Sequence, residues 1–144
     1  MKHYLKVVGC ALEHNAKFLI IKRPQGVHAA GLLAFPGGKV EEIDEQNEWD
    51  ILRSAAKREV FEEVGLDLKD DLTYVVSNYF VDSNGICVID TIFHCKIEKT
   101  VLNISASARE VPEYYWLSAD EIRVAQHSAE WLKKYISYIE AAKK

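Results

Sequence analysis

The sequence has little cysteine, no long apolar run and no excess of basic residues. Its three cysteines, Cys10, Cys87 and Cys95, are odd in number and widely spaced, which argues against a disulfide framework and a structural zinc site. No stretch approaches the roughly 20 apolar residues that a membrane-spanning helix requires. Lys6 interrupts the apolar N-terminal segment and no cleavage-like site follows, so we interpret this segment as a strand rather than a signal peptide. These absences predict a cytoplasmic protein without a membrane partner.

The charge balance is acidic, with a formal net charge of -4. Nucleic-acid binding proteins usually present a basic face, so we expect no nucleic-acid partner. An acidic chain that acts on a small phosphate-containing molecule needs a cation to offset the repulsion between its own charge and the phosphates. A divalent metal ion is the obvious candidate.

The composition is that of one globular domain, which we place over residues 1–144. Hydrophobic residues make up 49% of the chain and charged residues 28%, which fits a folded α/β domain with its own core. Apolar patterning predicts strands over 3–13, 18–21, 73–81, 87–97 and 114–117, and helices over 49–64 and 129–142.

Local signals mark the ends of several of these elements. Asn47 is a plausible cap at the start of the first helix, and Gly65 stands where a left-handed residue ends it. The Asn84–Gly85 pair favours a hairpin turn between two strands. Ser118 and Glu121 have the spacing of a capping box that opens a helical turn.

The helix expected over 49–64 places three glutamates on one face. At about 100° per residue, Glu59, Glu62 and Glu63 fall within a sector roughly 100° wide. Like charges at this spacing destabilise a helix, whereas a bound cation would reverse the effect. Carboxylate oxygens suit Mg²⁺, which also takes substrate phosphates as ligands. A solvated acidic face is the alternative, but Leu52 and Ala56 share this arc, which puts the glutamates at the edge of the core.

Two segments resemble one known family. Residues Arg58–Leu66, REVFEEVGL, are similar to the second half of the Nudix box, R-E-U-x-E-E-x-G-U, where U is aliphatic. Residues Phe35–Glu41, FPGGKVE, resemble the F-P-G-G-x-x-E lead-in of MutT-like Nudix hydrolases. The resemblance implies a Nudix fold, with a mixed β-sheet sandwiched between α-helices. It also implies a pyrophosphohydrolase that acts on phosphoric anhydride bonds.

The spacing between the two segments departs from the family pattern. That pattern places a glycine, five residues, a glutamate and seven residues before the Arg-Glu pair. Counting back from Arg58 in this way reaches Asp50, and Gly38 lies six residues too far upstream. We interpret the difference as an insertion within Glu42–Trp49, with Asp50 or Glu48 in place of the usual glutamate.

The resemblance also implies a metal site. Glu59, Glu62 and Glu63 would bind Mg²⁺, or Mn²⁺ in its place, with the carbonyl of Gly38 as an additional ligand. Arg58 would orient Glu59 through a charge-assisted hydrogen bond. The metal would polarise the bridging phosphates and lower the pKa of an attacking water.

A carboxylate must accept the proton of that water. In the family this base is a box glutamate, here Glu59 or Glu62, or a glutamate from a later loop. Glu110 precedes Trp116 by six residues, in the loop where MutT-like members place such a glutamate, and Glu113 is a weaker competitor. Either loop residue could equally be an ordinary surface acid.

The substrate side is less sharply marked. The resemblance suggests substrate contacts at Arg23, before the glycine turn, and at Phe35 and Gly37 within it. Gln126 and His127 precede the closing helix, where MutT-like members place a base-reading amide. The Gln126 amide offers both a donor and an acceptor, and His127 could add stacking. Exposure in a helix approach is the plainer interpretation of this last pair.

Two classes of function follow. The first is hydrolysis of a nucleoside triphosphate, including oxidised ones, to a nucleoside monophosphate and pyrophosphate. Dinucleoside polyphosphates and nucleotide sugars remain alternative substrates, because the box binds the diphosphate alone. The second is a non-catalytic nucleotide-binding module, which would be expected to have lost box glutamates that this chain retains. Both a monomer and a homodimer fit the sequence.

Overall fold

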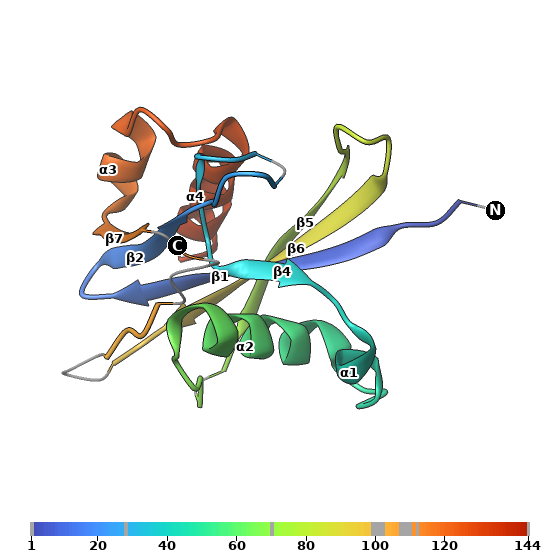
Figure 1. Ribbon diagram of the computed structural model, residues 1–144. Helices are drawn as coiled ribbons and strands as arrows, with labels where there is room; N and C mark the ends of the chain where they lie inside the picture. The colour runs from blue at the N-terminus through green and yellow to red at the C-terminus, as the bar shows by residue number, and fades with distance from the viewer. Residues whose placement is uncertain are drawn as a thin grey trace.

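The computed structural model describes residues 2–27, 29–69, 71–98, 103–106, 111 and 113–143. Within them a mixed sheet lies between two helical layers, with α1 and α2 on one side and α3 and α4 on the other (Figure 1). The strands are β1 (Leu5–His14), β2 (Lys17–Lys22), β3 (Leu33–Ala34), β4 (Gly37–Lys39), β5 (Thr73–Val81), β6 (Cys87–Lys96) and β7 (Glu113–Leu117). The helices are α1 (Glu42–Glu45), α2 (Ile51–Val64), α3 (Ala119–Val124) and α4 (Glu130–Ala142).

The sheet divides along one edge of β1. Its main order is β3-β2-β1-β6-β5, and β6 runs parallel to β1 from Leu5 to Glu13. Both β2 and β4 pair with the other edge of β1, β2 towards its end and β4 beside Val7–Gly9. The chain that connects β2 to β4 therefore begins and ends close to the point where the sheet divides.

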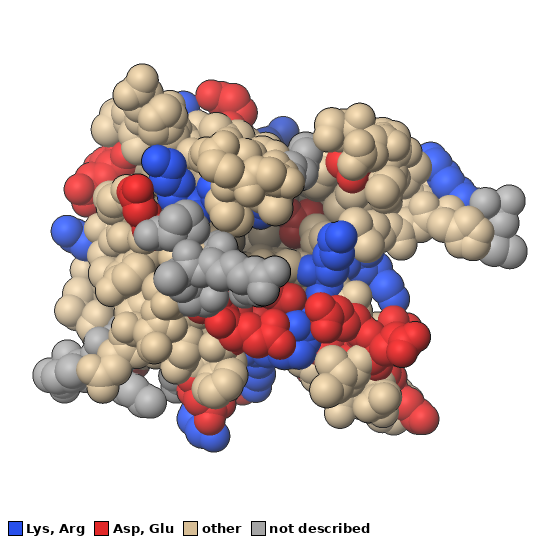
Figure 2. All heavy atoms as spheres, in the orientation of Figure 1, with Lys and Arg blue, Asp and Glu red and all other residues tan. Residues whose placement is uncertain are grey.

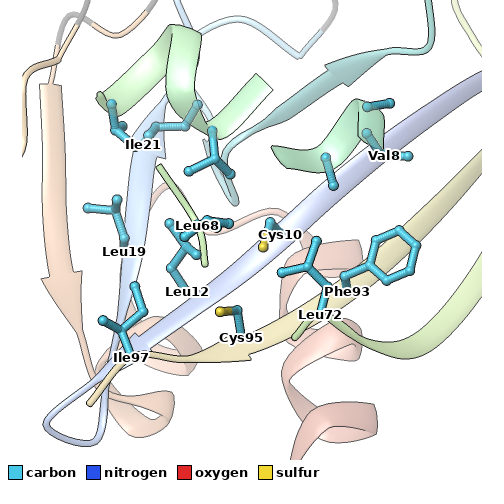
Figure 3. Close-up of a cluster of buried hydrophobic side chains, with 14 of the residues drawn as sticks. Val8, Cys10, Leu12, Leu19, Ile21, Leu68, Leu72, Phe93, Cys95 and Ile97 are labelled. Atoms are coloured by element: carbon cyan, nitrogen blue, oxygen red, sulfur yellow. The ribbon is translucent and has the colours of Figure 1, made fainter. Parts of the chain in front are cut away.

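Alternation along the strands builds a core on each face of the sheet. On one face Cys10 of β1 and Cys95 of β6 turn their sulfurs into the cluster that α2 covers with Val60 and Val64 (Figure 3). On the other face a second cluster packs under α3 and α4, and Ile136 of α4 is fully buried there. Burial of this apolar surface on both faces fixes the positions of α2 and α4 against the sheet.

The predicted elements are present, with small differences at their ends. Gly65 adopts φ 74° and donates its N–H to the carbonyl of Phe61, which confirms the predicted end of α2. The predicted capping box of Ser118 is also present. The prediction of Asn47 as the first cap is wrong, because α2 begins after Asp50, which adopts φ 55° and makes no side-chain capping bond.

The acidic segment before α2 is more ordered than its composition suggested. It contains the short helix α1 and buries the side chain of Asp44. No helix among the described residues is long and apolar enough to cross a membrane.

Candidate active site on the glutamate helix

The three box glutamates lie at the edge of the core. Glu59 and Glu63 are only 8% and 6% exposed, whereas the side chain of Glu62 is 47% exposed. Acidic side chains gather over α1 and α2 on one face of the molecule (Figure 2). The predicted placement of these carboxylates beside the core, rather than on a solvated far face, is therefore confirmed for two of the three.

Arg58 uses all five of its N–H donors within this cluster. Its Nε and Nη2 donate to the two oxygens of Asp44 at 2.9 Å, and Nη2 also donates to the carbonyl of Lys39 at 2.9 Å. Its Nη1 donates to Oε1 of Glu59 and to Oε2 of Glu62, both at 3.0 Å. The guanidinium thus joins the end of β4, helix α1 and the glutamates of α2 in one network.

Asp44 is the acid that anchors Arg58. Its side chain is 3% exposed and also accepts the backbone N–H of Glu41 at 2.8 Å. Burial alone would raise the pKa of Asp44, but the hydrogen bonds from Arg58 and Glu41 outweigh it and lower the pKa below its ordinary value. The same contact with Asp44 raises the pKa of Arg58, so this pair stays charged.

This arrangement corrects the expectation for Asp50 and Glu48. Five residues separate Gly38 from Asp44, so the family spacing holds to that point and the extra residues lie between Asp44 and Arg58. Asp50 instead accepts a hydrogen bond from Arg53, and Glu48 is exposed with φ 60°. Counting forward from Gly38 in the sequence identifies Asp44, whereas counting back from Arg58 leads to Asp50.

The two glycines of the turn are required by close approach. A Cβ on Gly38 would lie 2.6 Å from the carboxylate of Glu59, and one on Gly37 would lie 2.0 Å from the carbonyl oxygen of Val8. Burial in this tight contact raises the pKa of Glu59, although Arg58 acts in the opposite direction. The glycine turn and the glutamate helix are therefore built against one another.

The carboxylates and the adjacent backbone are oxygen ligands of the kind that Mg²⁺ prefers. Among the described side chains, however, no three acids, histidines or cysteines converge into a ready-made metal site. Glu59 and Glu62 are turned towards Arg58 instead. The donor set fits a divalent ion chemically, provided that the ion competes with Arg58 for these two carboxylates.

Arg23 directly follows β2 and interacts with acids from two other elements. Burial lowers the pKa of its guanidinium, while the carboxylates of Glu63 on α2 and Asp90 on β6 act to raise it. Phe35 is 6% exposed and packs against Phe18 with ring centroids 6.2 Å apart, so the structure places it in the core under α4.

The other predicted substrate contacts lie on the turn between α3 and α4. Gln126 and His127 are both exposed. The carbonyl of His127 accepts the N–H of Leu33 at 2.9 Å, which holds this turn beside β3. Glu110 lies outside the described residues, and Glu113 is exposed on β7, where its carboxylate contacts the hydroxyl of Tyr115.

A separate groove of about 540 Å³ lies on another face of α2, beside Arg53 and Lys57.

Sequence reasoning missed Asp90, the Tyr135 hydroxyl that donates to it, and Asn78, which donates to that hydroxyl. The sequence does contain one indication of this acid. Asp90 interrupts the apolar run of residues 87–93, CVIDTIF, and a charged residue within a strand of this kind is unusual. Nothing in the sequence pairs Tyr135 with it, since the two are 45 residues apart.

Comparisons with known proteins agree with this architecture. The NUDIX domain family model matches residues 3–137. A curated relative, the CTP pyrophosphohydrolase of Escherichia coli K12, is 38% identical over 63 residues, which cover 44% of this chain and 42% of the relative. The match thus spans less than half the length of that relative.

Solved structures share the fold at low sequence identity. The MutT protein of Methanosarcina mazei Go1 superposes with a TM-score of 0.79 at 22% identity and covers 99% of this chain and 98% of its own. An Ap4A hydrolase of C. elegans superposes with a TM-score of 0.74 at 16% identity, covering 96% and 97%. Since the family model covers nearly the whole sequence, the chain belongs to the NUDIX domain family of hydrolases.

Proposed function

We propose that this protein hydrolyses a nucleoside triphosphate, including oxidised forms, to a nucleoside monophosphate and pyrophosphate in a reaction that requires a divalent metal ion. The observation that carries the proposal is the joint construction of the glycine turn and the glutamate helix. Gly38 and Glu59 are in direct contact, and Arg58 joins Glu59 and Glu62. The relative named CTP pyrophosphohydrolase supports a nucleoside triphosphate as the substrate class.

Glu59, Glu62, Glu63 and the carbonyl of Gly38 would hold Mg²⁺ or Mn²⁺, which supplies charge neutralisation for the phosphates and acidifies a bound water. Arg58 keeps the Glu59 carboxylate in one orientation, because its own position is locked by Asp44. The raised pKa of Glu59 suits a group that accepts a proton, and Glu110 is the alternative base.

Contacts to the rest of the substrate would come from both sides of the dividing point in the sheet. Arg23, which interacts with Glu63, would meet a phosphate or sugar. Gly37 would let the substrate approach the backbone closely, while Gln126 and His127 are exposed beside β3 and available to a base. Phe35 would not touch the substrate directly, but its packing against Phe18 in the core would hold the glycine turn in position.

The test is a substrate panel with the purified protein. Nucleoside triphosphates, a dinucleoside tetraphosphate and a nucleotide sugar are incubated with Mg²⁺, with Mn²⁺ and with a chelator, and the products are separated. The expected result is nucleoside monophosphate with pyrophosphate, lost on chelation and in Glu63→Gln but kept in Glu130→Gln, an exposed glutamate of α4. Nucleotide binding without turnover would instead make the chain a binding module.

A further inference from the structure

A chain of hydrogen bonds ends at a partly buried aspartate on the face of the sheet that α4 covers. Asn78 of β5 and Asp90 of β6 stand directly opposite one another in the strand register. Nδ2 of Asn78 donates to Oη of Tyr135 at 3.2 Å, and Oη of Tyr135 donates to Oδ2 of Asp90 at 2.9 Å. Tyr135 of α4, itself bonded to Asn78 of β5, thus fixes one oxygen of this carboxylate.

The other oxygen of Asp90, Oδ1, receives no hydrogen bond from the residues that the structure describes. An ionised carboxylate has about four acceptor positions, and the described residues fill one of those of Asp90. Burial raises its pKa to about 6, although Tyr135 and Arg23 both favour the charged form. A partly buried acid whose pKa is raised in this way costs the fold stability, and such groups concentrate at functional sites.

Asp90 also lies within a nucleoside's length of the glycine turn. Val7 of β1 pairs with Asp90 on one side and with Lys39 on the other, so two strand spacings, about 10 Å, separate Asp90 from the residue after Gly38. Arg23 lies close enough to interact with both Asp90 and Glu63. Figure 2 shows a hollow in the molecular surface beside the acidic side chains of α1 and α2.

We infer that Asp90 is a specificity-determining residue, whose Oδ1 accepts a hydrogen bond from the exocyclic amino group of the substrate base. The inference rests on the proposed nucleotide hydrolysis and adds the class of base. An ionised carboxylate can only accept hydrogen bonds. The amino groups of cytosine and adenine donate, whereas an oxo group in the same place presents lone pairs to the carboxylate. Tyr135 is a positioning residue that fixes Oδ2 and leaves Oδ1 to the base.

The inference is tested with pairs of substrates that differ at this group. CTP is compared with UTP, and ATP with its 6-oxo counterpart ITP, by kcat/KM. In the pair that contains the better substrate, the amino form should be preferred roughly 10- to 100-fold, the effect of one hydrogen bond to a charged group. Asp90→Asn can donate to an oxo group, so it should reduce the preference to less than about threefold. Tyr135→Phe should reduce it partly.

A matched control is Asp120→Asn, the same exchange at an exposed position of α3, which should keep the wild-type ratio. Calorimetric binding of CMP and UMP without metal measures the same preference independently of turnover. Absence of turnover with a preference for CMP that Asp90→Asn removes would reject the proposed hydrolysis and keep the inference. Turnover with equal use of amino and oxo forms, or an unchanged ratio in Asp90→Asn, would overturn the inference alone.

Discussion

Two aspartates, the buried Asp44 and the partly buried Asp90, lie on opposite sides of the sheet and have opposite properties. Asp44 accepts two hydrogen bonds from Arg58 and one from the backbone of Glu41, and its pKa is lowered. Asp90 accepts a single hydrogen bond from Tyr135, and its pKa is raised to about 6. Burial acts in the same direction on both, so the number and charge of the partners decide the sign.

The difference separates a structural acid from one that is open to a ligand. The acceptor capacity of Asp44 is used to lock Arg58, and through it the glutamate face of α2. Oδ1 of Asp90 accepts no hydrogen bond from the residues that the structure describes. Removing a group that costs stability should make the fold more stable and weaken the function that the group serves. This is the usual trade-off between stability and binding.

The largest expected effect comes from the glutamate face of α2 that Asp44 supports through Arg58. Glu63→Gln should lower kcat by at least about 100-fold, because it removes a charge from the proposed metal and base cluster. The metal-free protein should remain folded and gain slightly in stability, since repulsion with Glu59 is relieved. Steady-state kinetics with Mg²⁺ and thermal unfolding without it measure both effects. Full activity in this variant would reject the assignment of the glutamate face.

Arg58→Lys should break the closed cluster itself. A lysine cannot serve Asp44, Glu59, Glu62 and the Lys39 carbonyl at once, so a buried carboxylate loses its two-pronged partner. We expect a loss of about 3 kcal/mol in the free energy of unfolding and a fall in kcat that exceeds any rise in KM.

The matched control for this variant is Arg123→Lys, at an arginine of α3 that pairs with Asp120 and Glu140 near the surface. Urea unfolding and kinetics should change little there. A rise in KM alone for Arg58→Lys would mean that the guanidinium contacts substrate rather than Glu59.

Asp90→Asn should act on stability with the opposite sign. Because the pKa of Asp90 is raised from 3.8 to about 6, its protonated form stabilises the fold below pH 4, and this contribution is lost as the pH rises through 6. The asparagine variant avoids that loss, so at pH 7.5 it should be more stable by about 2 kcal/mol. Tyr135 and Arg23 both interact with the carboxylate and lessen the gain.

Thermal unfolding at pH 4 and at pH 7.5 provides the measurement. The two proteins should differ at the higher pH and converge at the lower one. A variant less stable than wild type at pH 7.5 would show that the Asp90 charge strengthens the fold.

The sequence predicts the local features around these two acids but not their partners. The strands, the two long helices, the Gly65 stop and the crowding of Glu59 and Glu63 follow from periodicity and local capping chemistry, which are properties of neighbouring residues. The partner of Arg58 was missed because it lies 14 residues away across an insertion, and a fixed spacing gives the wrong acid. The pairing of Asp90 with Tyr135 depends on how α4 packs on the sheet, which no local pattern encodes.

The smallest effect is expected at Gln126, an exposed residue whose substitution tests a second contact to the base. Gln126 lies on the turn between α3 and α4, and the carbonyl of the next residue, His127, is bound to Leu33, so the turn is tied to the sheet. If its amide contacts the base, Gln126→Ala should raise KM for the preferred nucleotide by the value of one or two hydrogen bonds, on the order of 1 kcal/mol. Solvent can replace an exposed amide, so the loss should be smaller than that at the partly buried carboxylate of Asp90. Kinetics over four nucleoside triphosphates should show weaker discrimination between bases with kcat nearly unchanged, and identical KM values for variant and wild type would remove Gln126 from the site.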